Sequence, residues 1–137
     1  MDFNIFYSHL ISIPTIAFFM AVLIKGLSFY YNTGKINLKK ALSSGGMPSV
    51  HSAVVTSLTT AIALKYGVSS DLFAISLGFT VIIIYDAINI RYEAGLHAGA
   101  INKLLGEKFK EHLGHLPSEA FAGSLLGVIS ALFLFYI

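Results

Sequence analysis

The sequence contains no cysteine and no tryptophan among its 137 residues, and only 12% of its residues are charged. Without cysteine, the chain has no disulfide framework, no thiolate nucleophile and no cysteine-ligated zinc site. Soluble domains carry about 25% charged residues, whereas 55% of this chain is hydrophobic and its mean hydropathy is +0.76. A soluble chain of this length buries too small a fraction of its surface to hide so much apolar area. The net charge of +2 is too small to indicate nucleic-acid binding. The sequence therefore predicts an integral membrane protein with a single membrane-embedded domain over residues 1–137.

Four long segments have at most one charged residue, and each approaches the roughly 20 residues that a helix needs to cross about 30 Å of hydrocarbon. They cover residues 3–24, 41–64, 72–90 and 120–137. The predicted fold class is all-α: an integral membrane helical bundle with about four transmembrane helices. Pro14 is expected to bend the first of them. A short amphipathic helix at the membrane surface, or capping the bundle, is predicted within residues 92–112, where apolar side chains recur at helical spacing.

The basic residues are distributed unevenly around these segments. If all four helices cross the membrane, eight of the nine basic residues lie on one side: Lys25, Lys35, Lys39, Lys40, Arg91, Lys103, Lys108 and Lys110. Lys65 alone lies on the other side. The positive-inside rule then places the eight in the cytoplasm and both termini outside. The alternative is a three-span chain whose second segment is re-entrant, because that segment begins with glycines and polar residues.

The first group of residues with chemical potential is the run 43–52, which contains two glycines, a proline, several serines and a histidine. Proline favours the first position of a helix, and Gly46 with its neighbour frees the backbone before it. A helix starting at Pro48 would present unpaired amides to an anion such as phosphate, and Ser49 would add a hydroxyl donor. His51 would stand in the first turn. The alternative interpretation is a Gly-Gly turn and helix cap, with the histidine packed against polar neighbours.

The second group lies at the end of the third segment, where Asp86 interrupts an apolar run. A carboxylate inside a membrane is rare and usually paired. Spacing favours Asn89, one helical turn away, over Arg91, which is five residues away; another helix could also supply the partner. The group is either a structural ion pair at a helix end or, through the planar fork of Arg91, a clamp for phosphate oxygens.

The third group pairs His115 with Glu119, four residues later and across the helix start expected at Pro117. A carboxylate held beside a histidine fixes the imidazole tautomer and raises its basicity. The alternative is a capped helix with Glu119 favourably placed in its first turn. That alternative explains Glu119 but not His115.

With four spans, the polar residues of all three groups reach the same membrane face, together with Lys25. Two histidines, basic groups and helix-start amides suit phosphoryl transfer through a histidine nucleophile. We expect His51 and His115 to face one polar cavity near the membrane surface, with Arg91 at its wall. The sequence contains no Walker loop and no aspartate-rich magnesium motif, so we expect neither a metal nor another cofactor.

These runs resemble the divergent branch of the type 2 phosphatidic acid phosphatase and vanadium haloperoxidase superfamily. The resemblance covers nearly the whole chain and is carried by residues 45–52, 86–95, 101–103 and 113–123. Pro48, Ser49 and His51 match the superfamily's Pro-Ser-Gly-His motif, with Val50 in place of glycine. Arg91, His115 and Glu119 resemble its Ser-Arg and His-x-x-x-Asp motif, although 23 residues separate the arginine from the histidine.

The resemblance implies roles for these residues. His115 would be the nucleophile, Glu119 its orienting carboxylate, and His51 the acid that protonates the leaving group. Lys25 is the best candidate for the lysine of the first superfamily motif, with Lys39 and Lys40 as alternatives. Because the superfamily core has more helices than this chain, a homodimer is expected to supply the missing packing surface.

The function predicted from these features is a membrane phosphatase that hydrolyses a lipid phosphate or a polyprenyl phosphate or diphosphate through a phosphohistidine. Its partner would be a membrane lipid with a phosphate head group, bound from the bilayer with the polar site on the cytoplasmic side. The alternatives are a non-catalytic binder or transporter of phospholipid head groups, and a structural protein whose polar cluster only holds helices together. The titratable residues on one shared face argue against the last.

Overall fold

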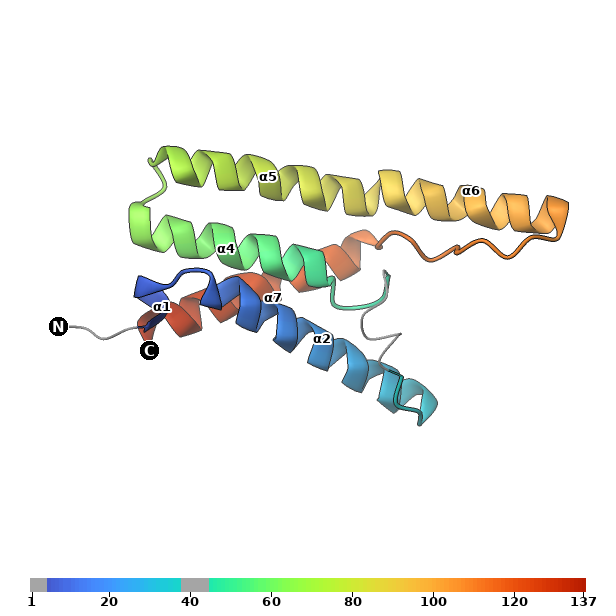
Figure 1. The fold of residues 1–137 in the computed structure, drawn as a ribbon, viewed down its shortest axis with the longest axis horizontal. Helices are drawn as coiled ribbons and strands as arrows, with labels where there is room; N and C mark the ends of the chain where they lie inside the picture. Colours follow the sequence, from blue (N-terminus) through green and yellow to red (C-terminus); the bar gives the residue numbers. More distant parts are fainter. Residues whose placement is uncertain (1–4, 38–44) are drawn as a thin grey trace.

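The computed structural model describes residues 5–37 and 45–137, and all its regular structure within these ranges is helical. Figure 1 shows the order and arrangement of the elements. They are α1 (Ile5–Ser8), α2 (Ser12–Thr33), α4 (Val50–Tyr66), α5 (Asp71–Ile88), α6 (Ile90–Leu105) and α7 (Pro117–Tyr136). The predicted all-α helical bundle is therefore confirmed.

Helix α4 is the centre of the bundle, because it packs against α2, α5 and α7. Its contact with α7 is close: a Cβ atom added at Gly127 would collide with the Thr56 hydroxyl and the Ala53 carbonyl. The Thr56 hydroxyl also lies 3.1 Å from the carbonyl oxygen of Ser124 on α7. On the other side, the hydroxyls of Thr59 and Thr80 are hydrogen-bonded at 2.8 Å between α4 and α5. Small and hydroxylated residues at such contacts are typical of helices packed in lipid.

Among the residues that the structure describes, three stretches are long and apolar enough to cross a membrane: α2, the α5–α6 run Asp71–Leu105, and α7. The fourth predicted span is α4, whose 17 residues extend about 25 Å. The outer face of α5 exposes large apolar side chains, with Ile75 at 70% and Ile82 at 66% exposure. Apolar surface on this scale belongs in hydrocarbon, and the chain is an integral membrane protein.

The first span differs from its predicted bounds. The expected segment ended at residue 24, before the first lysine, whereas α2 continues through Lys25 to Thr33. Lys25 is 6% exposed, and its side chain turns toward the polar end of the bundle, where it lines the same hollows as Glu119, His51 and His115 instead of facing lipid. Pro14 was expected to bend the first span, but its place in the helix gives no reason for a bend. Pro14 lies in the first turn of α2, where a missing backbone N–H breaks no helical hydrogen bond.

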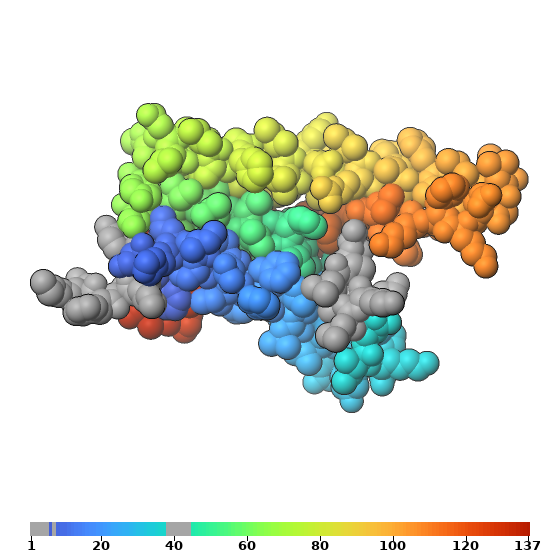
Figure 2. Space-filling model, viewed as in Figure 1, coloured from blue at the N-terminus to red at the C-terminus, as the bar shows by residue number. Residues whose placement is uncertain are grey.

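The predicted amphipathic helix is shorter and differently placed. Helix α6 ends at Leu105, and Gly106 closes it with a left-handed φ of 70°. The chain then returns beside α6, where the Asn102 side chain bonds both the carbonyl and the N–H of Phe109, at 2.9 and 2.7 Å. Figures 1 and 2 show that α6 prolongs the line of α5 and extends beyond the rest of the bundle. The apolar spacing over residues 101–109 therefore does not belong to one helix lying across the bundle.

The two ends of the bundle are different in character. Helix α1, the end of α7 and the turn between α4 and α5 lie at one end, and the starts of α4 and α7 lie at the other (Figure 1). Helix α4 runs the length of the bundle, and α5 returns beside it. Because α4 is not among the candidate spans of the described residues, the choice between four spans and a re-entrant second segment stays a prediction. All basic residues of the described ranges except Lys65 belong to segments at or beyond the second end.

Candidate active site at the polar end of the bundle

His115 and Glu119 form the central pair of the candidate site. His115 Nδ1 lies 2.9 Å from Glu119 Oε2, across the start of α7 at Pro117. The same carboxylate oxygen accepts the backbone N–H of Leu116 at 3.1 Å. The backbone N–H of His115 donates to the Ala87 carbonyl at the end of α5 at 3.0 Å, and His115 is 3% exposed. A neutral His115 that donates from Nδ1 to the carboxylate keeps a lone pair on Nε2.

The start of α4 is tied to the start of α7. Helix α4 begins at Val50, two residues later than predicted, with Ser49 as its N-cap. The Ser49 side chain accepts hydrogen bonds from the backbone N–H and the hydroxyl of Ser52, at 3.3 and 3.0 Å. The backbone N–H of Ser49 donates to the Glu119 carbonyl at 3.0 Å. Ser49 is fully buried, and its hydroxyl oxygen caps the helix. The predicted contact of this hydroxyl with phosphate stays a prediction.

His51 and His115 line one cavity of about 360 Å³. The two histidines share it with Lys25, and every other lining side chain is aliphatic or aromatic: Phe18, Val22, Val50, Val54, Val55 and Ile83. The predicted shared cavity is thus present, but it is mostly apolar rather than polar. Arg91 is not among its lining residues, and its guanidinium group pairs with Asp86 instead. The site therefore joins a polar end to apolar walls.

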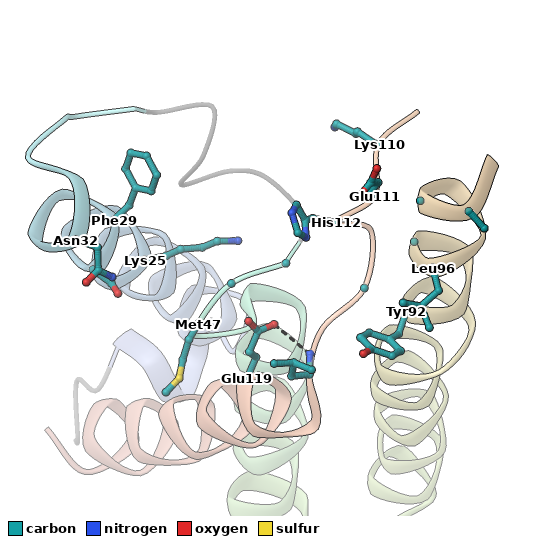
Figure 3. A pocket seen from close by; sticks show the side chains of 18 of the residues that line it. Lys25, Phe29, Asn32, Met47, Tyr92, Leu96, Lys110, Glu111, His112 and Glu119 are labelled. Carbon is teal, nitrogen blue, oxygen red and sulfur yellow. Dashed lines mark hydrogen bonds between the residues drawn. The ribbon is translucent and has the colours of Figure 1, made fainter. Parts of the chain in front are cut away.

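A second, larger hollow lies on the other side of the His115–Glu119 pair. It has a volume of about 1210 Å³, and Figure 3 shows Glu119, Lys25 and His112 around it. Lys25 lines both hollows. Its side chain passes Gly46, where an added Cβ would come within 3.3 Å of the Lys25 Cε atom. Gly46 is left-handed with φ of 83°, so a side chain there would be strained as well as crowded. Lys25 and Gly46 are therefore neighbours at the site.

Asp86 pairs with Arg91 rather than with Asn89. Arg91 Nε lies 2.5 Å from Asp86 Oδ2, whereas the Asn89 amide donates to the Tyr85 carbonyl at 3.2 Å. The predicted pairing of Asp86 with Asn89 was wrong because α5 ends at Asn89. The backbone angles of Asn89, φ −114° and ψ −78°, interrupt the regular helical spacing, so that Arg91 comes close to Asp86. Both side chains remain partly exposed, at 44% for Arg91 and 28% for Asp86.

Two close backbone contacts that spacing alone does not predict hold the site together. A Cβ at Gly114 would collide with the backbone of Tyr92, and one at Gly95 would collide with the Glu111 carbonyl. The segment before His115 is therefore pressed against α6 by two glycines. The large hollow also includes Lys103, Lys110 and His112. The sequence signal for Lys103 and Lys110 was their place among the basic residues of this end, and His97 is exposed on α6.

Some predicted residues do not enter this geometry. Lys39 and Lys40 lie outside the described residues, so Lys25 is the one candidate lysine that the structure places at the site. His9 is exposed at the opposite end of the bundle. Within residues 5–37 and 45–137, no three His, Asp or Glu side chains are grouped so that they could hold a metal ion.

Comparison with known proteins agrees with this arrangement. Residues 6–130 match the Divergent PAP2 family. The uncharacterized membrane protein YuiD of Bacillus subtilis (strain 168) is 41% identical over 123 residues, which cover 74% of this chain and 78% of that protein. No solved structure matches the chain. The family match covers α2, α4, α5, α6, the first fourteen residues of α7 and every residue of the candidate site, and the chain belongs to the Divergent PAP2 family.

Proposed function

We propose that the protein is a membrane phosphatase that removes phosphate from a lipid through a phosphohistidine on His115. The observation that carries the proposal is the 2.9 Å contact between His115 Nδ1 and Glu119 Oε2, beside a cavity that His115 shares with His51 and Lys25. A buried imidazole fixed by a carboxylate is a typical activated nucleophile.

The reaction has two steps. In the first, the lone pair of His115 Nε2 attacks phosphorus, the bond from phosphorus to the ester oxygen breaks, and His51 gives its proton to the leaving alkoxide. In the second, a water attacks the phosphohistidine, the phosphorus–nitrogen bond breaks, and His51 takes the proton of that water. Inorganic phosphate and the lipid alcohol are the products. Glu119 holds the His115 ring and stabilises the positive charge that develops on it.

Cationic and amide groups neutralise the phosphoryl oxygens in this proposal. Lys25 is buried and lines the cavity beside both histidines, so its charge acts in a low-dielectric setting where it is strong. The first backbone N–H groups of α4 add donors at the positive end of the helix. Arg91 uses Nε for Asp86, and its two terminal nitrogens are the part of the fork that would contact phosphate.

The site is proposed to face the cytoplasm, because the basic residues gather at its end of the bundle. A lipid would enter from the bilayer with its phosphate at the level of the two histidines. The apolar outer face of α2 beside the cavity supports entry from the bilayer, since Leu23 is 63% exposed next to Val22, which lines the cavity.

Phosphate release from a panel of lipid phosphates by the purified protein, with and without a chelator, tests the function. We expect chelator-resistant release that is lost in His115→Ala and retained in His9→Ala, which removes an exposed histidine at the other end. Acid-quenched protein should carry phosphate on His115. If the lipids bind but no phosphate is released, the protein is a head-group binder. Chelator-sensitive release without a phosphohistidine would indicate metal-assisted attack by water instead.

A further inference from the structure

The cavity beside the two histidines has a polar end and a wholly apolar body. Lys25, His51 and His115 supply the polar end. The walls come from three helices: Phe18 and Val22 on α2, Val54 on α4, and Ile83 on α5. Helix α4 packs against both α2 and α5, so the cavity lies on α4 between the other two helices. Its shape suits an amphiphile with its charged group at the histidines.

The change from polar to apolar lining is abrupt. Val54 follows His51 by three residues on α4, an axial rise of about 4.5 Å. Beyond the histidines and Lys25, no lining side chain offers a hydrogen bond. A phosphate placed at His115 would therefore have its leaving group against hydrocarbon from the first few atoms.

This property discriminates between two kinds of lipid phosphate. In a diacylglycerol phosphate, two ester groups lie within a few bonds of the phosphate oxygen, and each would lose its hydrogen bonds to water against these walls. A polar group that is buried without a partner is disfavoured. In the phosphate ester of a long-chain aliphatic alcohol, the hydrocarbon begins at the first carbon. That chain matches the lining along its whole length.

We propose that this cavity binds the hydrocarbon chain of the leaving alcohol between α2 and α5, so that the preferred substrate is the phosphate ester of a long-chain aliphatic alcohol rather than a phosphoglyceride. The inference rests on the proposed function for the reaction, but the binding of the chain can be tested separately. Ile83 and Ile82 provide a matched pair, because Ile83 lines the cavity and Ile82 points outward with 66% exposure.

The kinetic test uses dodecyl phosphate, dilauroyl phosphatidic acid and p-nitrophenyl phosphate, the two lipids at equal mole fraction in detergent micelles. We expect kcat/KM for dodecyl phosphate to exceed that for the phosphatidic acid by at least tenfold. Ile83→Trp should lower kcat/KM for dodecyl phosphate about tenfold, through a higher KM. The same variant should lower kcat/KM for p-nitrophenyl phosphate no more than about twofold. Ile82→Trp should change each value less than twofold. Equal or better turnover of phosphatidic acid, or equal losses on both substrates in Ile83→Trp, would overturn the inference while leaving a phosphatase.

A labelling experiment decides the matter without turnover. Dodecyl phosphate that carries a diazirine in its chain is photolysed with the wild-type protein, and the adducts are mapped by mass spectrometry. We expect adducts on the wall of α2 around Phe18 and Val22 and on α5 at Ile83, reduced several-fold in Ile83→Trp and unchanged in Ile82→Trp. Labelling confined to the exposed face of α5 would refute the chain site. Labelling at the wall in a protein that releases no phosphate from any substrate would refute the proposed function instead.

Discussion

At the residue scale, the double use of the Glu119 carboxylate has a measurable consequence. One oxygen of Glu119 meets both the His115 ring and the Leu116 N–H. In Glu119→Gln the side-chain oxygen can still accept one hydrogen bond, but the negative charge that stabilises the developing imidazolium is lost. We expect kcat to fall on the order of 10²- to 10⁴-fold, with little change in the thermal midpoint in detergent. Glu119→Asp keeps the charge and should lose less. Equal activity of Glu119→Gln and wild type would remove Glu119 from the mechanism.

His51 has a different signature, because its proposed role is to protonate the leaving oxygen. An alkoxide needs that proton, whereas p-nitrophenolate leaves readily without it. We therefore expect His51→Ala to slow dodecyl phosphate hydrolysis at least tenfold more than p-nitrophenyl phosphate hydrolysis. His97→Ala, which removes an exposed imidazole on α6, is the control and should affect neither rate. Equal losses on the two substrates in His51→Ala would contradict its role as the acid.

The residues of the site differ in how far spacing alone could predict them. His115 and Glu119 were predictable because a glutamate at the third position of a helix reaches back to the residues just before its start. The Asp86–Arg91 pair was not, since its geometry depends on the break at Asn89, which has no strong signal in the sequence. The contact of Lys25 with Gly46 joins segments far apart in the chain, and spacing carries no information on such contacts.

At the scale of the elements, the contact between α4 and α7 should be intolerant of a single methyl group. A Cβ at Gly127 collides with Thr56 and Ala53, whereas a Cβ at Gly78 on α5 has nothing within 4 Å. We expect Gly127→Ala to destabilise the protein by about 1–3 kcal/mol through overpacking. Gly78→Ala should be neutral or stabilising by up to about 1 kcal/mol, because alanine favours a helix. Unfolding in detergent micelles, followed by circular dichroism, measures both, and a similar effect in the two variants would contradict the packing described.

The hydrophobicity pattern predicts the presence of the helices better than it predicts where they end. Helices α2, α4, α5 and α7 were predictable, because a helix in a membrane must be apolar over most of its length. The ends of these helices were not predictable. A charged residue usually marks the end of a span, but α2 continues through Lys25 because that side chain points into the bundle rather than into lipid. The end of α6 at Gly106 was also missed, since the apolar residues on either side of it continue the helical spacing by coincidence.

At the scale of the whole molecule, the absence of cysteine makes the orientation simple to test. Ser69→Cys places a thiol in the exposed turn between α4 and α5, and Lys108→Cys places one on the exposed segment beyond α6. We expect a membrane-impermeant maleimide to label the first variant in intact cells and the second only after permeabilisation, because the positive-inside rule predicts a cytoplasmic basic end. The reverse pattern would move the site to the outer face of the membrane. The parent chain is the unlabelled control.

The hydrogen bond from the His115 N–H to the Ala87 carbonyl ties His115 to the end of α5. Helix α5 has 18 residues and is about 27 Å long, close to the hydrocarbon thickness of a bilayer. We expect a span formed by α5 to hold His115 at one leaflet boundary. In a thicker or thinner bilayer the helix tilts or the lipid deforms, and the plane of the lipid phosphates moves away from the ring. Turnover of a lipid phosphate should then peak at one acyl-chain length of the host vesicle and fall on either side. Hydrolysis of p-nitrophenyl phosphate, which arrives from water, should stay constant. The ratio of the two rates would then depend on the thickness of the membrane.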